Sequence, residues 1–276
     1  RFTDPEILRS SLAGVILRMK SLHLGNVEDF PFLEAPTRRA ITDGYQLLNE
    51  LGAVDDLNEL TALGAELAKL PLDPRVGRMI LEARSRNALD EVLIIASALS
   101  VQDVRERPLE AQAQADQAHA KFDDEKSEFT SYLKLWHWIE EARGGKPHGG
   151  AALANAQNAQ NGAQNGAQNG VRLQLSDLAG SKNRSLTPNQ PAATHKLSNR
   201  QYEALLRQNF VSVRRVREWR DIHSQLHTVV AEHGWKLNST PASYEQLHLS
   251  MLSGLLGNIG CKHETEEVYL GARGIK

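Results

Sequence analysis

The chain has 276 residues, a formal net charge of −2, 41% hydrophobic residues and 24% charged residues. This composition is typical of one or two folded domains, and it excludes a fully disordered chain, a collagen-like fibre and a disulfide-rich miniprotein. No segment approaches the roughly 18 consecutive apolar residues of a membrane span, so we expect no membrane partner. The single cysteine, Cys261, excludes an intrachain disulfide and a cysteine-cluster metal site, and it fits a cytoplasmic setting.

Two helices and a hairpin are predicted for the first part of the chain. Apolar residues recur every three or four positions over 5–23, which predicts an amphipathic helix. Thr37 is the expected N-cap of a second helix that ends near Leu51. Two short extended runs, 53–55 and 59–61, then predict a small hairpin. Helix, helix and hairpin together indicate a winged helix with the hairpin as its wing, and an ordinary loop is the alternative.

After the hairpin, apolar residues follow a helical period almost throughout, so we expect a mainly α fold. Ser198 and Ser212 are expected N-caps of two of the later helices. A strand is expected near the C-terminus, and since one strand cannot pair its own edges, we expect the sequence to be a piece of a longer protein. The other predicted helices cover about 75–86, 88–100, 109–120, 125–143 and 242–257.

Residues 144–198 differ in character from the rest of the chain. They contain three consecutive Ala-Gln-Asn-Gly repeats that end at Gly162, Gly166 and Gly170. A four-residue period with Asn-Gly in each repeat suits neither helix nor strand packing, and the low apolar content cannot offset the entropy lost on ordering. We therefore predict a flexible, low-complexity insertion here.

The sequence shows no catalytic motif. It contains neither a G-x-x-x-x-G-K-[ST] phosphate loop nor a G-x-G-x-x-G loop, and no H-E-x-x-H zinc motif. His223 and His227 have helical i, i+4 spacing, but a further metal ligand is not evident, so no metal site is assigned. Neighbouring carboxylates such as Asp55 and Asp56 fall at turns, where capping is the expected role. No residue of the chain is predicted to be catalytic.

Positive charge is concentrated in one stretch. Residues 200–220 hold six arginines against two glutamates, although the first half of the chain is acidic. A local cationic surface on an otherwise acidic chain indicates a face for an anionic partner. Arg105 and Arg107, in a predicted turn, are a weaker pair of candidates, and Arg38 and Arg39 alone are too few for a DNA-reading helix.

Two of the clustered arginines share one face of their predicted helix. Arg214 and Arg217 are one turn apart, and Arg215 flanks them on the other side. Guanidinium groups suit phosphate oxygens, which points to nucleic acid. The alternative lies in the same segment, because Arg214 with Glu218 and Arg217 with Asp221 form i, i+4 pairs that would make only a solvated, salt-bridged face.

Several segments resemble the helicase-associated region of DEAH-box ATP-dependent RNA helicases, and the turn DVRERP at 103–108 is most similar to the bacterial HrpA type. The closing YLGAR at 269–273 is similar to the first strand of the family's OB-fold. The segments that carry the rest of the resemblance are LPLDPR at 70–75, RMIL at 78–81, ASALSVQD at 96–103, FDDEKSEF at 122–129 and NFVSVRRVREW at 209–219.

The resemblance implies a domain order. Residues 1–70 would be a winged helix, and 71–265 a helical-bundle ratchet domain that contains the insertion at about 144–198. Residues 266–276 would begin a truncated OB-fold. ATP and Mg²⁺ would bind to RecA-like domains elsewhere in the parent helicase, so this chain would hold no cofactor and would be inactive as an ATPase alone.

The resemblance also implies a role. The ratchet would form one wall of a channel for single-stranded RNA and couple RecA-like domain motion to strand translocation and unwinding. The chain would contact the RecA-like and OB-fold domains of its own polypeptide and act as a monomer. The alternatives are a winged-helix nucleic-acid-binding module or a helical protein-interaction module outside any helicase. With the turn arginines included, the candidate RNA-binding residues are Arg214, Arg215, Arg217, Asn209, Arg105 and Arg107.

Overall fold

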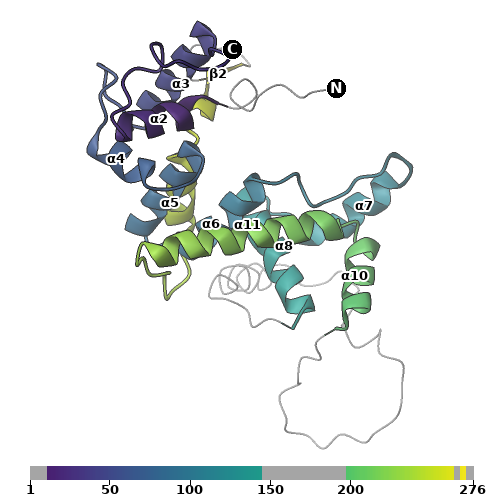
Figure 1. Cartoon of the computed structure of the whole chain (residues 1–276). Helices are drawn as coiled ribbons and strands as arrows, with labels where there is room; N and C mark the ends of the chain where they lie inside the picture. The colour runs from purple at the N-terminus through teal and green to yellow at the C-terminus, as the bar shows by residue number, and fades with distance from the viewer. Residues whose placement is uncertain (1–10, 145–196, 264–267, 272–276) are drawn as a thin grey trace, which may run out of the picture.

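The computed structural model describes residues 11–144, 197–263 and 268–271, which are mostly helical (Figure 1), so the prediction of a mainly α fold is confirmed. The predicted flexible insertion lies almost entirely outside the described residues, as does the start of the first predicted helix. The helices are α2 (Ala13–Ser21), α3 (Arg38–Glu50), α4 (Ala62–Ala68), α5 (Pro74–Ser85), α6 (Leu89–Leu99), α7 (Gln112–His119), α8 (Glu128–Ala142), α10 (Asn199–Gln208), α11 (Val213–Glu232) and α12 (Tyr244–Leu252).

The helices α2, α3 and α4 surround one hydrophobic cluster with a narrow hairpin between α3 and α4. The hydroxyl of Thr37 accepts a hydrogen bond from the amide of Ala40, as expected of an N-cap. Gly52 has a φ of 72° just after α3 and allows the chain to turn. The hairpin that follows is closed by an antiparallel bridge between Val54 and Leu60. The sequence pattern of helix, helix and hairpin is therefore present.

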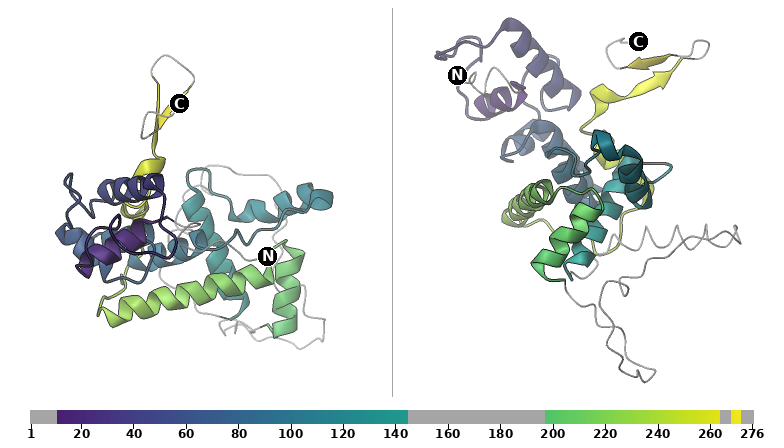
Figure 2. Two further views of the ribbon diagram at one scale, coloured as in Figure 1. Left: turned by 45° about the horizontal axis from the view of Figure 1, so that its top comes forward. Right: turned by 90° about the vertical axis from the view of Figure 1, so that its right-hand side faces the viewer.

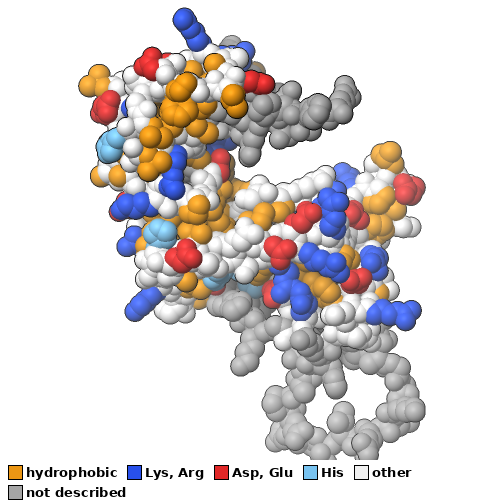
Figure 3. All heavy atoms as spheres, viewed as in Figure 1, with side chains coloured by type: hydrophobic (Ala, Val, Ile, Leu, Met, Phe, Trp, Pro, Cys, Tyr) orange, Lys and Arg blue, Asp and Glu red, His pale blue; other side chains and the backbone are white. Residues whose placement is uncertain are grey.

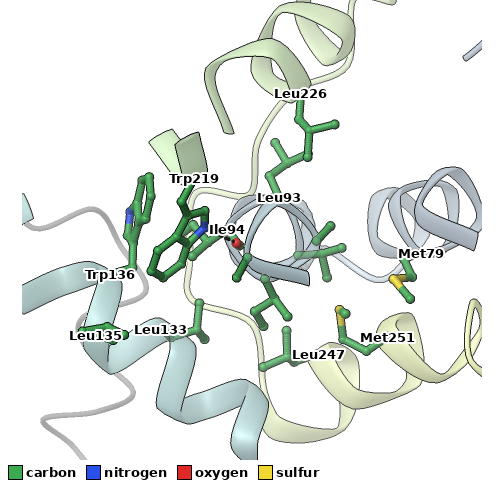
Figure 4. Close-up of a cluster of buried hydrophobic side chains, with 14 of the residues drawn as sticks. Met79, Leu93, Ile94, Leu133, Leu135, Trp136, Trp219, Leu226, Leu247 and Met251 are labelled. Atoms are coloured by element: carbon green, nitrogen blue, oxygen red, sulfur yellow. Dashed lines mark hydrogen bonds between the residues drawn. The ribbon is translucent and has the colours of Figure 1, made fainter. Parts of the chain in front are cut away.

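A second cluster is built around α6, whose neighbours are α5, α8, α11 and α12 (Figure 4). Every residue from Leu89 to Ala98 is buried except Asp90. A helix that is apolar on all sides is expected only inside a core. Trp219 of α11 is fully buried, and its indole N–H donates to the carbonyl of Ile94 at 3.0 Å. The long helix α11 is therefore fixed to α6 by packing and by a buried hydrogen bond.

One carboxylate lies within this core. Glu91 is 1% exposed, and it accepts hydrogen bonds from the side-chain amide of Asn238 at 2.9 Å and from the backbone of Ala242 at 2.8 Å. Asn238 in turn accepts from the amide of Asp90 at 2.8 Å. A buried carboxylate needs such donors because its desolvation is costly. The network ties the loop between α11 and α12 to the start of α6.

The two clusters are in direct contact. Leu72 and Trp235 pack against both of them, and the guanidinium of Arg84 lies 4.8 Å from the centre of the Trp235 ring. Between the clusters, α5 begins with Asp73 as its N-cap and Pro74 in its first turn, which the sequence LPLDPR favours. No extended linker separates them, so the described helices form a continuous body.

The structure departs from the sequence prediction at three places. The helix expected over about 242–257 is shorter, because α12 ends at Leu252 and a 3₁₀ turn follows at Leu256–Asn258. The helix expected over 109–120 is broken into a 3₁₀ turn at Leu109–Ala111, the helix α7 and a second 3₁₀ turn at Ala120–Phe122. The C-terminal strand, β2 (Tyr269–Gly271), pairs antiparallel with β1 (Gly260–Lys262), which the sequence analysis did not predict. This pair of strands projects beyond the helices in both views of Figure 2.

Substitution of two glycines by alanine tests the packing of the winged-helix part. A Cβ atom on Gly64 would lie 2.0 Å from the carbonyl oxygen of Ala53, whereas one on Gly14 would meet only the ring of Pro74 at 3.7 Å. We expect Gly64→Ala to lower the free energy of unfolding by about 1–3 kcal/mol, because the obstacle is backbone and outweighs the better helix propensity of alanine. Gly14→Ala should leave stability unchanged or slightly raised. Urea unfolding measures both, and equal effects would contradict the packing described.

Candidate nucleic-acid interface

The candidate residues lie on or next to the junction where α10 ends and α11 begins. The turn at 103–108 runs alongside this junction: Arg105 forms an isolated antiparallel bridge with Val211, and the amide of Glu106 donates to the carbonyl of Phe210 at 2.7 Å. His119 of α7 lies with its Nε2 3.1 Å from the same carbonyl oxygen. The turn at 103–108 and the helix α7, both far away in the sequence, therefore hold the backbone of residues 210–211 in place.

Arg214 and Arg217 are both exposed on the outer face of α11. The side chain of Arg214 is 84% exposed, and its Nε lies 3.1 Å from Oε1 of Glu218, as the helical spacing predicted. Arg217 is 68% exposed, but it pairs with Glu203 of α10 at 2.6 Å rather than with Asp221. This contact joins two helices, which the sequence could not show because it depends on how α10 and α11 meet.

Arg215 and Arg105 have a different environment. Arg215 donates to the backbone carbonyl of Asp103 at 2.9 Å. Arg105 is only 17% exposed and forms ion pairs with Asp103 and Glu128. Burial alone would raise the pKa of the Asp103 carboxyl, but the hydrogen bonds and charge of Arg105 outweigh it and hold that pKa below its ordinary value. Arg215 therefore holds the turn against α11, and Arg105 joins the turn to Glu128 at the start of α8.

The remaining two candidates flank this turn. The guanidinium of Arg107 is 61% exposed and pairs with Asp116 of α7. Asn209 donates from its side-chain amide to the carbonyl of Leu205 at 2.8 Å, and its amide oxygen accepts from Lys121 at 2.5 Å. Asn209 thus ends α10 and links it to the segment after α7.

Lys121 is a cation at this site that sequence reasoning missed. Its ammonium nitrogen lies 4.4 Å from the centre of the Trp138 ring and 4.9 Å from that of Phe122. Burial lowers the pKa of Lys121 from its ordinary value. Its place near Asn209 depends on the contact between the α7 segment and the α10–α11 junction, and no local sequence pattern reveals that contact.

The start of α11 combines the positive end of the helix dipole with the positive charge of two arginine side chains. The side chain of Ser212, the N-cap, forms no capping hydrogen bond, and the first turn holds no acidic residue but contains Arg214 and Arg215. Arginines at the positive end of a helix dipole are electrostatically unfavourable without an anion nearby. Figure 3 shows basic and acidic side chains interspersed over this side of the molecule. The surface is therefore a mixed one, and the start of α11 contributes Arg214 and Arg215 to it.

The described residues do not support a metal site or a membrane span. They include no group of three or more histidine, cysteine or acidic residues placed to hold a metal ion. The rings of His223 and His227 lie 4.4 Å apart, edge to face, and His223 also packs against Trp136 at 4.5 Å, which is aromatic packing. Within the same described ranges, no helix has both the length and the apolar character needed to cross a membrane.

Comparison with known proteins identifies two domains. Residues 45–72 match the winged-helix model of the helicase-associated domain HA2, and residues 73–135 match its ratchet-like model. The chain is 38% identical over 99% of its length to the ATP-dependent RNA helicase HrpA of Escherichia coli (strain K12). It is equally identical over 99% of its length to the HrpA homolog of Haemophilus influenzae (strain ATCC 51907 / DSM 11121 / KW20 / Rd). It spans 17% and 18% of those two relatives.

These matches confirm the winged helix and the ratchet that the sequence resemblance implied. The ratchet-like match covers α5, α6, the turn at 103–108 and α7. The arginine helix α11 lies beyond the matched range, but it packs directly on α6 within it. The RNA-contact roles of the six candidate residues remain predictions.

The ion pairs of Arg105 give the first prediction for this surface. We expect Arg105→Leu to lower the free energy of unfolding by about 1–2 kcal/mol at neutral pH, because it leaves Asp103 and Glu128 without their partner. The folded protein lowers the pKa of Asp103 from its ordinary value of 3.8. The ionised Asp103 therefore stabilises the fold above pH 3.8, and this stabilisation is lost as the pH falls through the lower pKa of the folded state. The difference between variant and wild type should therefore shrink below about pH 4.

Chemical denaturation of the two proteins at pH 7 and pH 3 measures this difference. Arg107→Leu is the matched control, because its pair with Asp116 is exposed on both sides and should contribute at most about 1 kcal/mol. An Arg105 variant as stable as wild type at pH 7 would contradict the structural role assigned to this residue.

Proposed function

We propose that this chain, which contains the winged-helix and ratchet-like helicase-associated domains, is the non-catalytic part of an HrpA-type RNA helicase that forms one wall of the channel for single-stranded RNA. The observation that carries the proposal is the exposed pair Arg214 and Arg217 on α11, directly after a junction that is locked to the ratchet-like turn at 103–108. The similarity to RNA helicases over almost the whole chain supports it.

The chemistry of these two arginines suits the phosphates of a strand. Each is more than two-thirds exposed, and each is paired with a surface carboxylate, Glu218 or Glu203. Exposed ion pairs of this kind contribute about 0.2–1 kcal/mol, so a phosphate can replace the carboxylate at little cost. Such contacts read no sequence and weaken with salt, because binding releases the counterions of the strand.

The packing supports a role in coupling. Leu72 and Trp235 join the two hydrophobic clusters, and Trp219 fixes α11 to α6. In the proposed function, a displacement applied to the winged-helix part would reach the arginine helix through these packed side chains. In the proposed helicase, RecA-like domains would bind ATP with Mg²⁺ and supply that displacement. The sequence of this chain contains no phosphate-binding loop.

The remaining partners belong to the same proposal. The chain would contact RecA-like and OB-fold domains of its own polypeptide and work as a monomer in the cytoplasm. A winged-helix DNA reader is less well supported, because α3 borders an open groove of about 540 Å³ whose lining includes the carboxylates of Glu28 and Asp56. Negative charge at that surface repels a duplex backbone.

A helical scaffold without RNA contact is the second candidate. It is favoured by one observation: Arg214 and Arg217 have carboxylate partners, and Arg215 has a carbonyl partner. In that case the arginines would form surface ion pairs and hydrogen bonds within the protein and would not contact RNA. The two candidates differ in what happens to RNA binding when the exposed pair is removed.

The test is fluorescence anisotropy of a labelled single-stranded RNA over a salt series. We expect the double variant Arg214→Ala/Arg217→Ala to bind more weakly and to lower the slope of log K against log salt by about 1.4, because each lost phosphate contact removes about 0.7. Its melting temperature should change little, since both arginines are exposed and Glu203 keeps its second ion pair, with Arg207.

The matched control is Arg38→Ala/Arg39→Ala, which removes two exposed cations from the winged-helix part. We expect this control to bind single-stranded RNA like wild type. If the α11 variant bound as wild type does, the scaffold would be favoured. If only the α3 variant lost binding, the winged helix would be the nucleic-acid surface.

A further inference from the structure

The backbone at Phe210 is strained at the centre of the candidate interface. Phe210 has a φ of 52°, in the left-handed region that bulky side chains rarely adopt. It follows Asn209, the C-cap of α10, and its amide donates to Arg207 while the amide of Val211 donates to Leu206. This is the Schellman arrangement that ends many helices, and its left-handed position normally holds glycine.

The other helix ends of the chain provide an internal comparison. Gly52 and Gly234 occupy the corresponding left-handed position after α3 and α11, and Asn87 occupies it after α5. After α2 the residue is His23, which is exposed. Asparagine and histidine tolerate this conformation better than most side chains. Among the described residues, Phe210 is thus the one bulky apolar side chain in this position.

The surroundings keep Phe210 in this conformation. Its carbonyl oxygen accepts from the amide of Glu106 at 2.7 Å and lies 3.1 Å from Nε2 of His119, which is also 3.1 Å from the carbonyl of Asn209. Both carbonyls are acceptors, so the ring nitrogen of His119 is the donor to both. Strain that is over-determined by neighbouring contacts points to a functional use of the side chain.

Core packing does not explain the choice of phenylalanine. Phe210 is partly exposed, belongs to neither hydrophobic cluster, and makes no ring–ring contact within the described part of the chain. Two cations belong to the same junction: Lys121 is bonded to the neighbouring Asn209, and the exposed Arg214 is the second residue of α11. A partly exposed aromatic ring on a surface that carries cations is the arrangement with which proteins stack an unpaired base.

We propose that the ring of Phe210 is a stacking platform for a base of the bound single strand. This proposal rests on the proposed function and deepens it. The arginines would contact the phosphates of the strand, and Phe210 would contact one of its bases. Stacking is tolerant of sequence, since every base has a π face. It also distinguishes a single strand from a duplex, in which the bases are already stacked on one another.

The test uses substitutions that separate the ring from the backbone. Phe210→Gly removes the ring and also the strain, so we expect an equal or higher melting temperature together with about tenfold weaker binding of single-stranded RNA. Phe210→Leu keeps apolar bulk without a π face and should also bind more weakly. Phe210→Tyr should bind as wild type does. Affinity is measured by anisotropy with a uridine oligomer.

Stacking itself is followed with one 2-aminopurine in that oligomer, because its fluorescence is quenched when it stacks. We expect wild type and Phe210→Tyr to quench it and the glycine and leucine variants to quench it less. His23→Gly relieves the same backbone strain after α2 and should leave RNA binding unchanged. Phe30→Leu removes an exposed aromatic ring from the winged-helix part and should also leave it unchanged.

The outcomes separate the two proposals. A Phe210→Gly variant that melts well below wild type would show a structural ring and overturn the stacking role. The stacking role would also be overturned if the glycine and leucine variants bound RNA as tightly as wild type while the double variant Arg214→Ala/Arg217→Ala bound weakly. That result would leave the proposed RNA surface intact. Failure of wild type to bind single-stranded RNA would overturn both.

Discussion

The burial of α6 is the constraint on which the rest of the structure depends. A helix that is apolar on nearly every side has to be covered on every side, and α5, α8, α11 and α12 are the elements that cover it. The hydrogen bond from Trp219 fixes the rotation and height of α11 on this helix. The rotation of α11 in turn decides that Val216 faces inward while Arg214 and Arg217 face outward. The candidate interface is therefore a consequence of core packing.

Local sequence signals predicted the parts of the fold that depend on short-range chemistry. Thr37 and Ser198 were recognisable as helix N-caps, and each side chain accepts the hydrogen bond of its cap. Ser212 was also expected to be an N-cap, and it occupies that position without a side-chain hydrogen bond. The outward face of α11 also followed from its period. The pairing of β1 with β2 was not predictable, because a three-residue strand of sequence Gly-Cys-Lys carries almost no pattern.

The candidate site was predictable in its composition and not in its contacts. The spacing in α11 predicted the pair of Arg214 with Glu218, which is local. It predicted the wrong partner for Arg217, because Glu203 comes from a different helix. The position of Lys121 and the engagement of Arg105 with Glu128 depend on tertiary contacts of the same kind. The left-handed backbone of Phe210 was likewise hidden, since a sequence rule places glycine there.

The mixture of charges on this surface fits the proposed function, in which the surface contacts an RNA strand that has to move. A wall of unpaired arginines would hold phosphates tightly and release them slowly, because each contact would add its full electrostatic attraction. On the proposed RNA surface, each exposed arginine has a carboxylate that would take the place of a departing phosphate, so the free-energy difference between the bound and the free state of each contact would be small. Weak contacts that exchange in turn allow a strand to advance one step without complete detachment. The fixed element in such a scheme would be the backbone of the α10–α11 junction, which hydrogen bonds from the turn at 103–108 hold in place.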